Sequence, residues 1–251
     1  MSEISMELDG EQLHRVIKVL GRVSNEIVLL DSKDNTSFWA IEESGATLIS
    51  ATLPRNSVFR KETQRGAMVR FNANLLERSV SKVGAFRLSL LFANERLYLR
   101  TIGPLPGSTT QPELLDIKYQ FPVLLGEPPR TFPALSLIYE VTLKLTDLHS
   151  HLERMNVVAD FFQMIPEPGS LRFVASDEVR GNCTVSLNIK ASRSEMLKDG
   201  FQYRIEPLIH VLDEIGGPQE ITLGIARRGE LYVSTERDSI KYDLVIAVVL
   251  K

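Results

Sequence analysis

The amino-acid sequence predicts an α+β protein of two similar domains, each made of mostly antiparallel sheet with two helices. Apolar residues at a helical spacing recur in four places, and the last two repeat the order of the first two. Short apolar runs of strand length fill the chain between them. A proline-rich stretch, residues 124–133, lies at the midpoint, where prolines that fix φ and remove donors favour a connector. We therefore expect an N-terminal domain over residues 1–123 and a C-terminal domain over residues 134–251.

The predicted helices cover residues 10–23, 73–83, 145–156 and 206–215. In the first, four apolar residues spaced i, i+3, i+4 and i+7 make one face: Leu13, Val16, Ile17 and Leu20. Asp9, with Gln12 three residues later, predicts an N-cap of the capping-box type. Pro207 suits the first turn of the fourth helix, and the run from Gly216 to Pro218 is expected to end it.

Strand-like runs occupy most of the remaining sequence. They cover residues 27–30, 47–53, 87–91, 96–100, 171–175, 184–189, 220–224, 231–233 and 240–248. Three short polar or glycine-containing pairs lie between such runs and predict hairpin turns: Asn94-Glu95, Pro168-Gly169 and Arg228-Gly229. Consecutive strands joined by tight turns are antiparallel, which gives the expected sheet type.

Amino-acid composition limits the classes of protein to which the chain can belong. The apolar fraction of 43% and the charged fraction of 24% are typical of a soluble globular protein. The net charge of −3 argues against a wholly basic surface but allows a local basic face. Cys183 is the only cysteine, so we expect no disulfide framework and a reducing compartment. We expect no secretory signal, because the first residues do not combine a charged region with an apolar core, and the apolar runs are too short to span a bilayer.

The sequence contains few signals of catalytic chemistry. The sequence lacks a G-x-G-x-x-G motif after a strand, a P-loop, an H-E-x-x-H motif and a G-x-S-x-G elbow. His149 and His151 are two residues apart on a predicted helix and so point to different sides, which makes a poor metal pair. Cys183 is expected to be a small buried hydrophobe. We expect no catalytic residues, no metal and no cofactor.

Basic residues on the polar sides of the helices are the one functional signal. Such residues often serve only solubility, but their recurrence in equivalent places of a repeat favours a shared role in binding phosphate. The acidic fourth helix weakens that interpretation. The candidate residues for this role are Arg15, Lys18, Arg22, Arg78, Lys82, Lys144, His151 and Arg154.

The ordering of elements resembles a protomer of the DNA sliding clamps, the proliferating cell nuclear antigen superfamily. Residues 38–49 resemble the first hairpin and central loop of those proteins, residues 125–132 the interdomain connector, and residues 241–244 the terminal strand. The resemblance implies a ring in which two helices per domain line a central hole, with no catalysis. It also implies that the candidate basic residues on the polar sides of the helices face duplex DNA. It covers nearly the whole chain.

One branch of the superfamily is most similar in places. Residues 145–155 followed by residues 169–173 resemble the Hus-type subunit of the DNA-damage checkpoint clamp, as do residues 116–124. The early stretch, residues 20–58, resembles the Rad-type partner subunits about as well. The terminal strand continues into residues 245–249 without the proline of replicative clamps, which favours a checkpoint role over a replicative one.

The resemblance also implies surfaces and partners. Edge strands would join subunits through Ile117, Tyr119, Phe121, Thr184, Ser186 and Asn188. Partner proteins would contact Ile41, Ala46, Leu125, Pro128, Phe132 and Val245. The implied partners are duplex DNA, other clamp subunits (a heterotrimeric ring favoured, a homotrimer possible), a clamp loader, and repair or replication proteins. The implied location is the nucleus, or the cytoplasm or nucleoid of a non-eukaryotic cell.

Three other interpretations of the function remain open. The first is a replicative homotrimeric clamp that acts as a polymerase processivity factor. The second is an α+β enzyme whose active site is assembled from scattered residues, which a deep pocket with converging titratable groups would indicate. The third is a protein-interaction scaffold that makes no contact with nucleic acid.

Overall fold

The computed structural model describes residues 4–31, 35–54, 58–63, 67–80, 87–93, 96–104, 114–122, 135–194, 200–217 and 219–249. The chain forms two compact units. Within the described residues, the first unit is drawn from Met1–Ile41, Ser50–Thr131 and Ser239–Lys241, and the second from Glu42–Ile49, Phe132–Asp238 and Tyr242–Lys251. The expected connector, residues 124–133, lies outside the described residues, so the domain boundaries stay a prediction.

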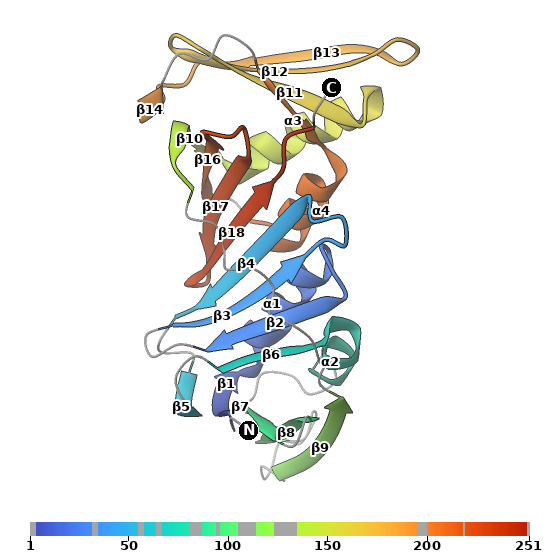
Figure 1. Ribbon diagram of the computed structural model, residues 1–251, viewed down its shortest axis with the longest axis vertical. Coiled ribbons are helices and arrows are strands. Elements are labelled where there is room, and N and C mark those ends of the chain that lie inside the picture. Colours follow the sequence, from blue (N-terminus) through green and yellow to red (C-terminus); the bar gives the residue numbers. More distant parts are fainter. Residues whose placement is uncertain are drawn as a thin grey trace. The chain divides into compact units, whose positions relative to one another are not determined.

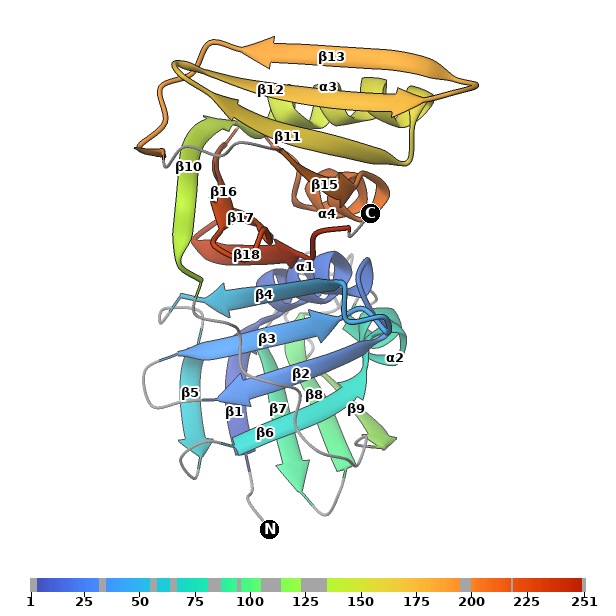
Figure 2. The same cartoon turned by 45° about the horizontal axis from the view of Figure 1, so that its top comes forward.

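The first half of the chain contains β1 (Ile4–Asp9), α1 (Gly10–Gly21), β2 (Glu26–Asp31), β3 (Thr36–Ile41), β4 (Thr47–Leu53), β5 (Val58–Thr63), β6 (Ala67–Asn72), α2 (Ala73–Val80), β7 (Arg87–Ala93), β8 (Arg96–Pro104) and β9 (Leu114–Pro122). The second half contains β10 (Leu137–Lys144), α3 (Leu145–Val158), β11 (Phe161–Glu167), β12 (Ser170–Asp177), β13 (Gly181–Leu187), β14 (Arg193–Ser194), β15 (Phe201–Arg204), α4 (Glu206–Ile215), β16 (Glu220–Ala226), β17 (Leu231–Arg237) and β18 (Ile240–Ile246). Figures 1 and 2 together label them.

The two halves repeat the same order and the same strand pairing. In the first, β1 lies between β5 and β7, and the order continues through β8 to β9. In the second, β10 lies between β14 and β16, and the order continues through β17 to β18. The pairings of β2 with β3 and β6 likewise match those of β11 with β12 and β15. The repeat predicted from the helix positions is therefore present in the sheets. The pairings of β1, β2, β8, β10, β11 and β16 with their neighbours in these sheets are antiparallel.

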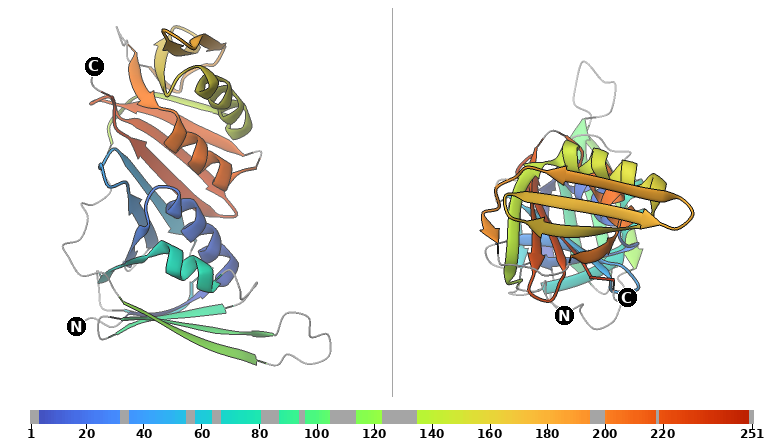
Figure 3. Two further views of the ribbon diagram at one scale, coloured as in Figure 1. Left: turned by 90° about the vertical axis from the view of Figure 1, so that its right-hand side faces the viewer. Right: turned by 90° about the horizontal axis from the view of Figure 1, so that it is seen from above.

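The first unit has its core between helix α1 and the sheets. Asp9 caps α1: its Oδ1 accepts a hydrogen bond from the Gln12 backbone N–H at 2.9 Å, as the sequence predicts. The predicted apolar stripe is buried, with Leu13, Val16, Ile17 and Leu20 all 0% exposed. Helix α2 packs beside α1 (Figure 3, left) and buries Ala73, Leu76 and Val80. The apolar side of each helix is thus fixed inward, and the polar side is left outward.

The second unit is built in the same way. Helix α3 packs against β12 and β13, which lie side by side with β11 (Figure 2). Its buried stripe is Leu145, Leu148, Leu152 and Met155. The buried ring of Phe162 packs in a tilted geometry against the rings of Phe173 and Tyr203, at centroid distances of 5.8 and 5.6 Å. Helix α4 begins with a proline in its first turn and ends at Gly216, whose N–H donates to Leu212 O at 2.8 Å, as predicted.

Candidate functional site

The outward side of α1 carries a cationic stripe. Lys18 and Arg22 are exposed, and Arg15 is half-buried. These three residues fall within one face because they are spaced by three and four. Arg15 NH2 also lies 3.4 Å from Glu11 Oε1, one turn earlier. On the neighbouring helix α2, Arg78 is exposed. Lys82 lies outside the described residues.

The equivalent helices of the second unit carry mixed charge. Lys144, the N-cap residue of α3, and Arg154 are exposed. His151 is half-buried, and its Nδ1 is buried without a hydrogen-bond partner among the described residues. Burial lowers the pKa of His151, as does the nearby charge of Arg154, while Asp147 acts in the opposite direction. His151 is therefore held toward its neutral form, which reduces its worth as a phosphate contact.

His149 connects the two helices of this unit. Its Nε2 lies 2.6 Å from Asp213 Oδ1 on α4, and its Nδ1 lies 3.5 Å from Glu153 Oε2 on α3. The contact with Asp213 is close but lacks hydrogen-bond geometry, so it acts as an ion pair when the imidazole is protonated. Two carboxylates thus flank one imidazole. Within the described residues, no group of three or more His, Cys, Asp or Glu side chains is arranged to hold a metal ion.

The two candidate interface strands each end a sheet. β9 is last in the five-stranded order, and β13 is last in the four-stranded order. Along β13, exposed and half-buried side chains alternate: Asn182, Thr184 and Ser186 are exposed, whereas Cys183, Val185 and Leu187 are half-buried. Asn188 is exposed but lies one residue beyond the strand. The β9 residues Ile117, Tyr119 and Phe121 pair with β8, and their side chains lie outside the described part of the structure.

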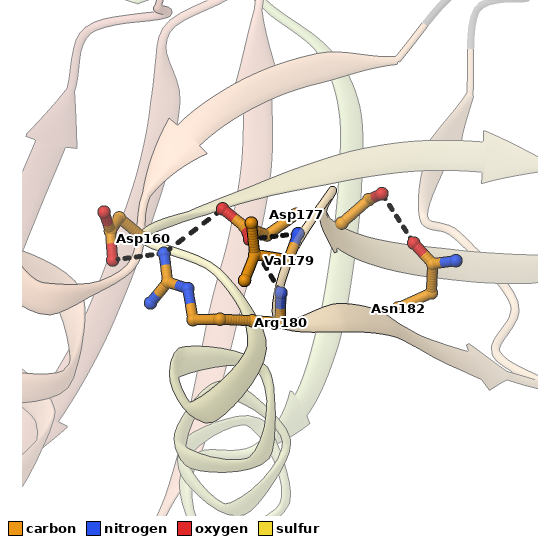
Figure 4. Close-up of polar contacts among 6 residues, drawn as sticks. Asp160, Asp177, Val179, Arg180 and Asn182 are labelled. Atoms are coloured by element: carbon orange, nitrogen blue, oxygen red, sulfur yellow. Dashed lines mark hydrogen bonds and ion pairs between the residues drawn. The ribbon is translucent and has the colours of Figure 1, made fainter.

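The turn between β12 and β13 is closed by a set of polar contacts (Figure 4) that the sequence did not predict. Asp177 Oδ1 accepts hydrogen bonds from the backbone N–H groups of Val179, at 2.9 Å, and Arg180, at 2.8 Å. Arg180 NH2 in turn donates to Asp160 Oδ1 at 3.0 Å. Val179 is 93% exposed at this turn. The position of Asp177 between two predicted strands was the available signal, since Asp side chains can accept hydrogen bonds from backbone N–H groups a few residues on.

The candidate partner surface includes a hairpin loop in the second unit. Glu42 accepts hydrogen bonds from Arg204 NH1 at 2.9 Å and from the Thr47 hydroxyl at 2.7 Å. The carbonyl of Ala46, which is half-buried, accepts a hydrogen bond from the Ala247 N–H at 2.7 Å. This bond ties the loop to the segment that follows β18. Glu42 and Arg204 are 162 residues apart in sequence, so no local pattern could have identified the pair.

The remaining predicted partner residues differ in accessibility. Ile41 is half-buried at the end of β3, whereas Val245 is only 8% exposed in β18. Among the described residues, the Val245 side chain therefore offers little accessible surface to a partner protein. Leu125, Pro128 and Phe132 fall outside the described residues. In the part of the chain that is described, no helix is both long and apolar enough to cross a membrane.

Solved structures with this architecture define it as the sliding-clamp fold. The similarity runs from end to end of the chain: A. fulgidus PCNA, in a structure with the bound C-terminal region of FEN-1, matches over 99% of each chain with a TM-score of 0.78 and 11% identity. PCNA from Entamoeba histolytica matches over 100% of each chain, with a TM-score of 0.77 and 10% identity. A chain of the PCNA2–PCNA3 complex from Sulfolobus tokodaii matches over 97% of this chain and 98% of its own, with a TM-score of 0.75 and 13% identity.

The predicted fold, an α+β sliding-clamp protomer with two similar halves, is confirmed by these structural similarities. Comparisons of sequence do not add to this evidence for the fold: no protein-family profile matches the chain, and no curated protein sequence matches it. Identities of 10–15% establish the shared fold alone.

Proposed function

We propose that this chain is a ring-forming DNA clamp subunit, which encircles duplex DNA and recruits partner proteins without catalysing a reaction. One observation carries the proposal: the whole chain, not one domain of it, matches clamp protomers over 97–100% of both chains. A match over the whole protomer, which includes both halves of the repeat and the outer strands β9 and β13, supports the clamp role more strongly than a match to one half would.

The proposed DNA contact rests on the cationic helix residues. Lys18, Arg22, Arg78, Lys144 and Arg154 are exposed on helices whose other faces are buried. Basic side chains held this way neutralise phosphates without reading base sequence, which suits a protein that must move along DNA. Arg15, His151 and Lys82 complete the proposed set, with His151 the weakest member because its pKa is lowered.

The proposed ring is closed by strand pairing between protomers. β9 and β13 each end a sheet on a different unit, so one protomer's β9 can pair with its neighbour's β13 in a head-to-tail contact. Such a contact is heterologous. It produces a closed ring when the rotation that relates neighbouring subunits is a whole fraction of 360°. The PCNA2–PCNA3 complex shows that clamp chains of this fold assemble with chains of a second kind.

The proposed partner surface comprises Ile41, Ala46, Val245 and the connector residues Leu125, Pro128 and Phe132. A. fulgidus PCNA binds the C-terminal region of FEN-1, which supports recruitment of DNA repair or replication proteins as the role of the present chain. A clamp loader belongs to the same proposal, because a closed ring must be opened to admit a long duplex.

Within this class we favour a subunit of a heterotrimeric DNA-damage checkpoint clamp, located in the nucleus of a eukaryotic cell or in the cytoplasm or nucleoid of another. Support comes from the Hus-type resemblance of residues 145–155 and from the terminal segment, residues 245–249, which lacks proline. The second candidate is a replicative homotrimer, favoured by the similarity to PCNA chains. Sedimentation separates them: a stable trimer of the chain alone supports the replicative form, and a monomer that trimerises only with other clamp subunits supports the checkpoint form.

A threading experiment tests encirclement without a loader. The assembled ring is mixed with a short linear duplex whose ends are open, or blocked beforehand by bound streptavidin. A ring reaches the duplex through open ends alone, so we expect retention on open duplex and loss of retention when both ends are blocked. Adding the blocks after binding should trap the ring. Equal binding to open and pre-blocked duplex would show a side-on contact and overturn the proposal.

A further inference from the structure

The segment that follows β18 is bound to the rest of the second unit through its backbone. The Ala247 N–H donates a hydrogen bond to the Ala46 carbonyl at 2.7 Å, and the Val249 N–H donates to the Gln202 carbonyl at 2.8 Å. All four residues belong to the second unit. The three described residues after β18 are half-buried, whereas Ile246, the last residue of the strand, is 1% exposed. A firmly packed strand therefore ends at Ile246, and a less buried segment continues from it.

Strand β15 meets this segment with its outer edge. It is last in the four-stranded order and pairs with β11 on its other side. Backbone groups of successive residues in an antiparallel strand point to alternate sides. The Ile205 N–H, just past β15, donates to the Asp160 carbonyl beside β11 at 3.0 Å, so the backbone groups of Gln202 and Arg204 point away from β11. Outer edges of sheets readily pair with an added strand, and the bond from Val249 shows that this edge accepts one.

The two donors of the segment have the spacing of a strand. Ala247 and Val249 are two residues apart, and in extended backbone the N–H groups of residues i and i+2 point to the same side, about 7 Å apart. The N–H of Val248 then points to the opposite side. Both bonds join main-chain atoms, so they do not depend on the side chains of the segment. An extended segment of another protein, without proline at the two donor positions, can make the same bonds.

The two acceptors are held together by contacts that do not involve this segment. Arg204, two residues after Gln202, donates from NH1 to Glu42 Oε1 at 2.9 Å. The other carboxylate oxygen of Glu42 accepts the Thr47 hydroxyl at 2.7 Å, and the Glu42 N–H donates to the Thr47 carbonyl at 2.9 Å. Strand β15 is thus joined directly to the hairpin loop that carries Ala46. Acceptors that are already in place reduce the ordering that a new strand must bring about.

We infer that residues 247–249 form a removable strap over a strand-binding site, and that an extended segment of a partner protein takes their place. The partner segment pairs with the outer edge of β15 and with the Ala46 carbonyl, through backbone N–H groups two residues apart. This inference rests on the proposed recruitment of partner proteins and adds the backbone groups that a partner engages. Because the strap is tethered beside the site, it competes with any incoming segment at a high effective concentration.

A synthetic peptide with the sequence of residues 245–251 is the probe, because it carries the donors of the strap itself. Fluorescence anisotropy compares its binding to the full chain and to a variant that lacks residues 247–251, and thermal unfolding verifies that both are folded. We expect the deletion to raise the affinity by about tenfold or more, because a site left free for about a tenth of the time binds with an affinity reduced by that fraction. Equal affinity for the two proteins, or binding to neither, would overturn the inference.

Two proline variants of the full chain provide a matched pair that does not shorten it. Val249→Pro removes the donor to Gln202, so it should raise the affinity for the peptide toward that of the deletion variant. Val248→Pro keeps both donors and should leave the affinity at that of the full chain. The same gain from both variants would show that the hydrogen bond to Gln202 does not hold the strap in place, and would count against the inference.

N-methylated peptides test whether the contact is strand pairing. Methylation at the positions of Ala247 and Val249 blocks both donors and should abolish binding to the deletion variant, whereas methylation at the position of Val248 should not. Binding that survives the double methylation would show that side chains hold the peptide, which contradicts the inferred mode. A ring that threads onto open duplex while its deletion variant binds no peptide overturns this inference alone. A ring whose deletion variant binds the peptide, but which threads onto no duplex, overturns the clamp function alone.

Discussion

Arg180 joins the β12–β13 turn to the end of helix α3: its guanidinium donates to the Asp160 carboxylate at 3.0 Å, across 20 residues of chain (Figure 4). The same guanidinium lies 3.6 Å from Asp177 Oδ2. Asp177 in turn accepts two backbone hydrogen bonds from the turn. The three residues fix a turn that carries the exposed side chain of Val179 beside the outer strand β13.

The pKa of Asp177 provides the first prediction. The backbone N–H groups of Arg180 and Val179 stabilise the carboxylate and lower its pKa below the ordinary 3.8. A carboxyl whose pKa is lower in the folded state stabilises the fold above its unfolded pKa, and this contribution is lost as pH falls through the folded value. We expect an NMR titration midpoint for Asp177 below 3.8 and faster exchange of the Val179 and Arg180 amides in Asp177→Ala at neutral pH. Glu178→Gln, an exposed change in the same turn, is the control and should leave both amides unaltered.

Gly229 is the second testable position. Its φ is +92°, and a Cβ placed there would lie 2.7 Å from the ring of Phe201. Its carbonyl also accepts the Tyr203 hydroxyl at 2.8 Å. Gly229→Ala should therefore lower the free energy of unfolding by roughly 1–3 kcal/mol through backbone strain, with a further loss from the clash. Urea unfolding measures this change.

Gly169→Ala is the matched control for Gly229, because its φ is +76° but nothing lies within 4 Å of its Cβ. It should lose stability through backbone strain alone, about 1–2 kcal/mol. A loss at Gly169 equal to that at Gly229 would show that the contact with Phe201 relaxes without cost.

Assembly through the outer strands is the third prediction. Proline removes a backbone donor, so Val185→Pro in β13 or Ile117→Pro in β9 should abolish ring formation while the protomer stays folded. Sedimentation of the variants with their partner subunits measures assembly. Successive N–H groups of a strand point to opposite sides, so Thr184→Pro is made alongside Val185→Pro. The proposed interface is wrong if the β13 variant that keeps its thermal unfolding temperature still forms rings.

The loop at Ala46 gives the fourth prediction. A photoreactive amino acid placed at Ala46 in the assembled ring should crosslink to proteins that the ring recruits from extract of the source cells, because this loop is tied to the segment after β18 and forms part of the proposed partner surface. The same amino acid at Glu178, exposed in the β12–β13 turn, is the comparison. Mass spectrometry identifies the products. Products formed at Glu178 and absent at Ala46 would place recruitment elsewhere on the subunit.

Helices were predicted more closely than strands because their signal is local. The four apolar residues of α1 repeat at the helical period and all are buried, so position and inward face both followed from the sequence. Helix α3 runs two residues beyond its predicted end at residue 156, where Val157 is 77% exposed and interrupts the apolar pattern. Strand β13 begins at Gly181 rather than at residue 184, because pairing of Asn182 with Ser176 extends the ladder into residues of low strand propensity.

The exposure of candidate site residues could be predicted only where it follows from the helical period of the apolar residues. The exposed positions of Lys18, Arg22 and Arg154 follow from the apolar stripes on the opposite sides of their helices. The contacts of His149 with Asp213 and of Arg204 with Glu42 join residues far apart in sequence, so they depend on tertiary packing that no local pattern contains. A strand over residues 184–189 was predicted, but not the hydrogen bonds of Asp177 that close the turn before it.

Cys183 gives the chain a built-in attachment point. It is the sole thiol in 251 residues, and it is half-buried in the outermost strand of its sheet. A maleimide fluorophore or nitroxide can therefore be placed on β13 without removing competing thiols from this chain. In the proposed ring, a neighbouring strand laid along β13 would shield the sulfur, so the rate of alkylation would report whether that ring is open or closed.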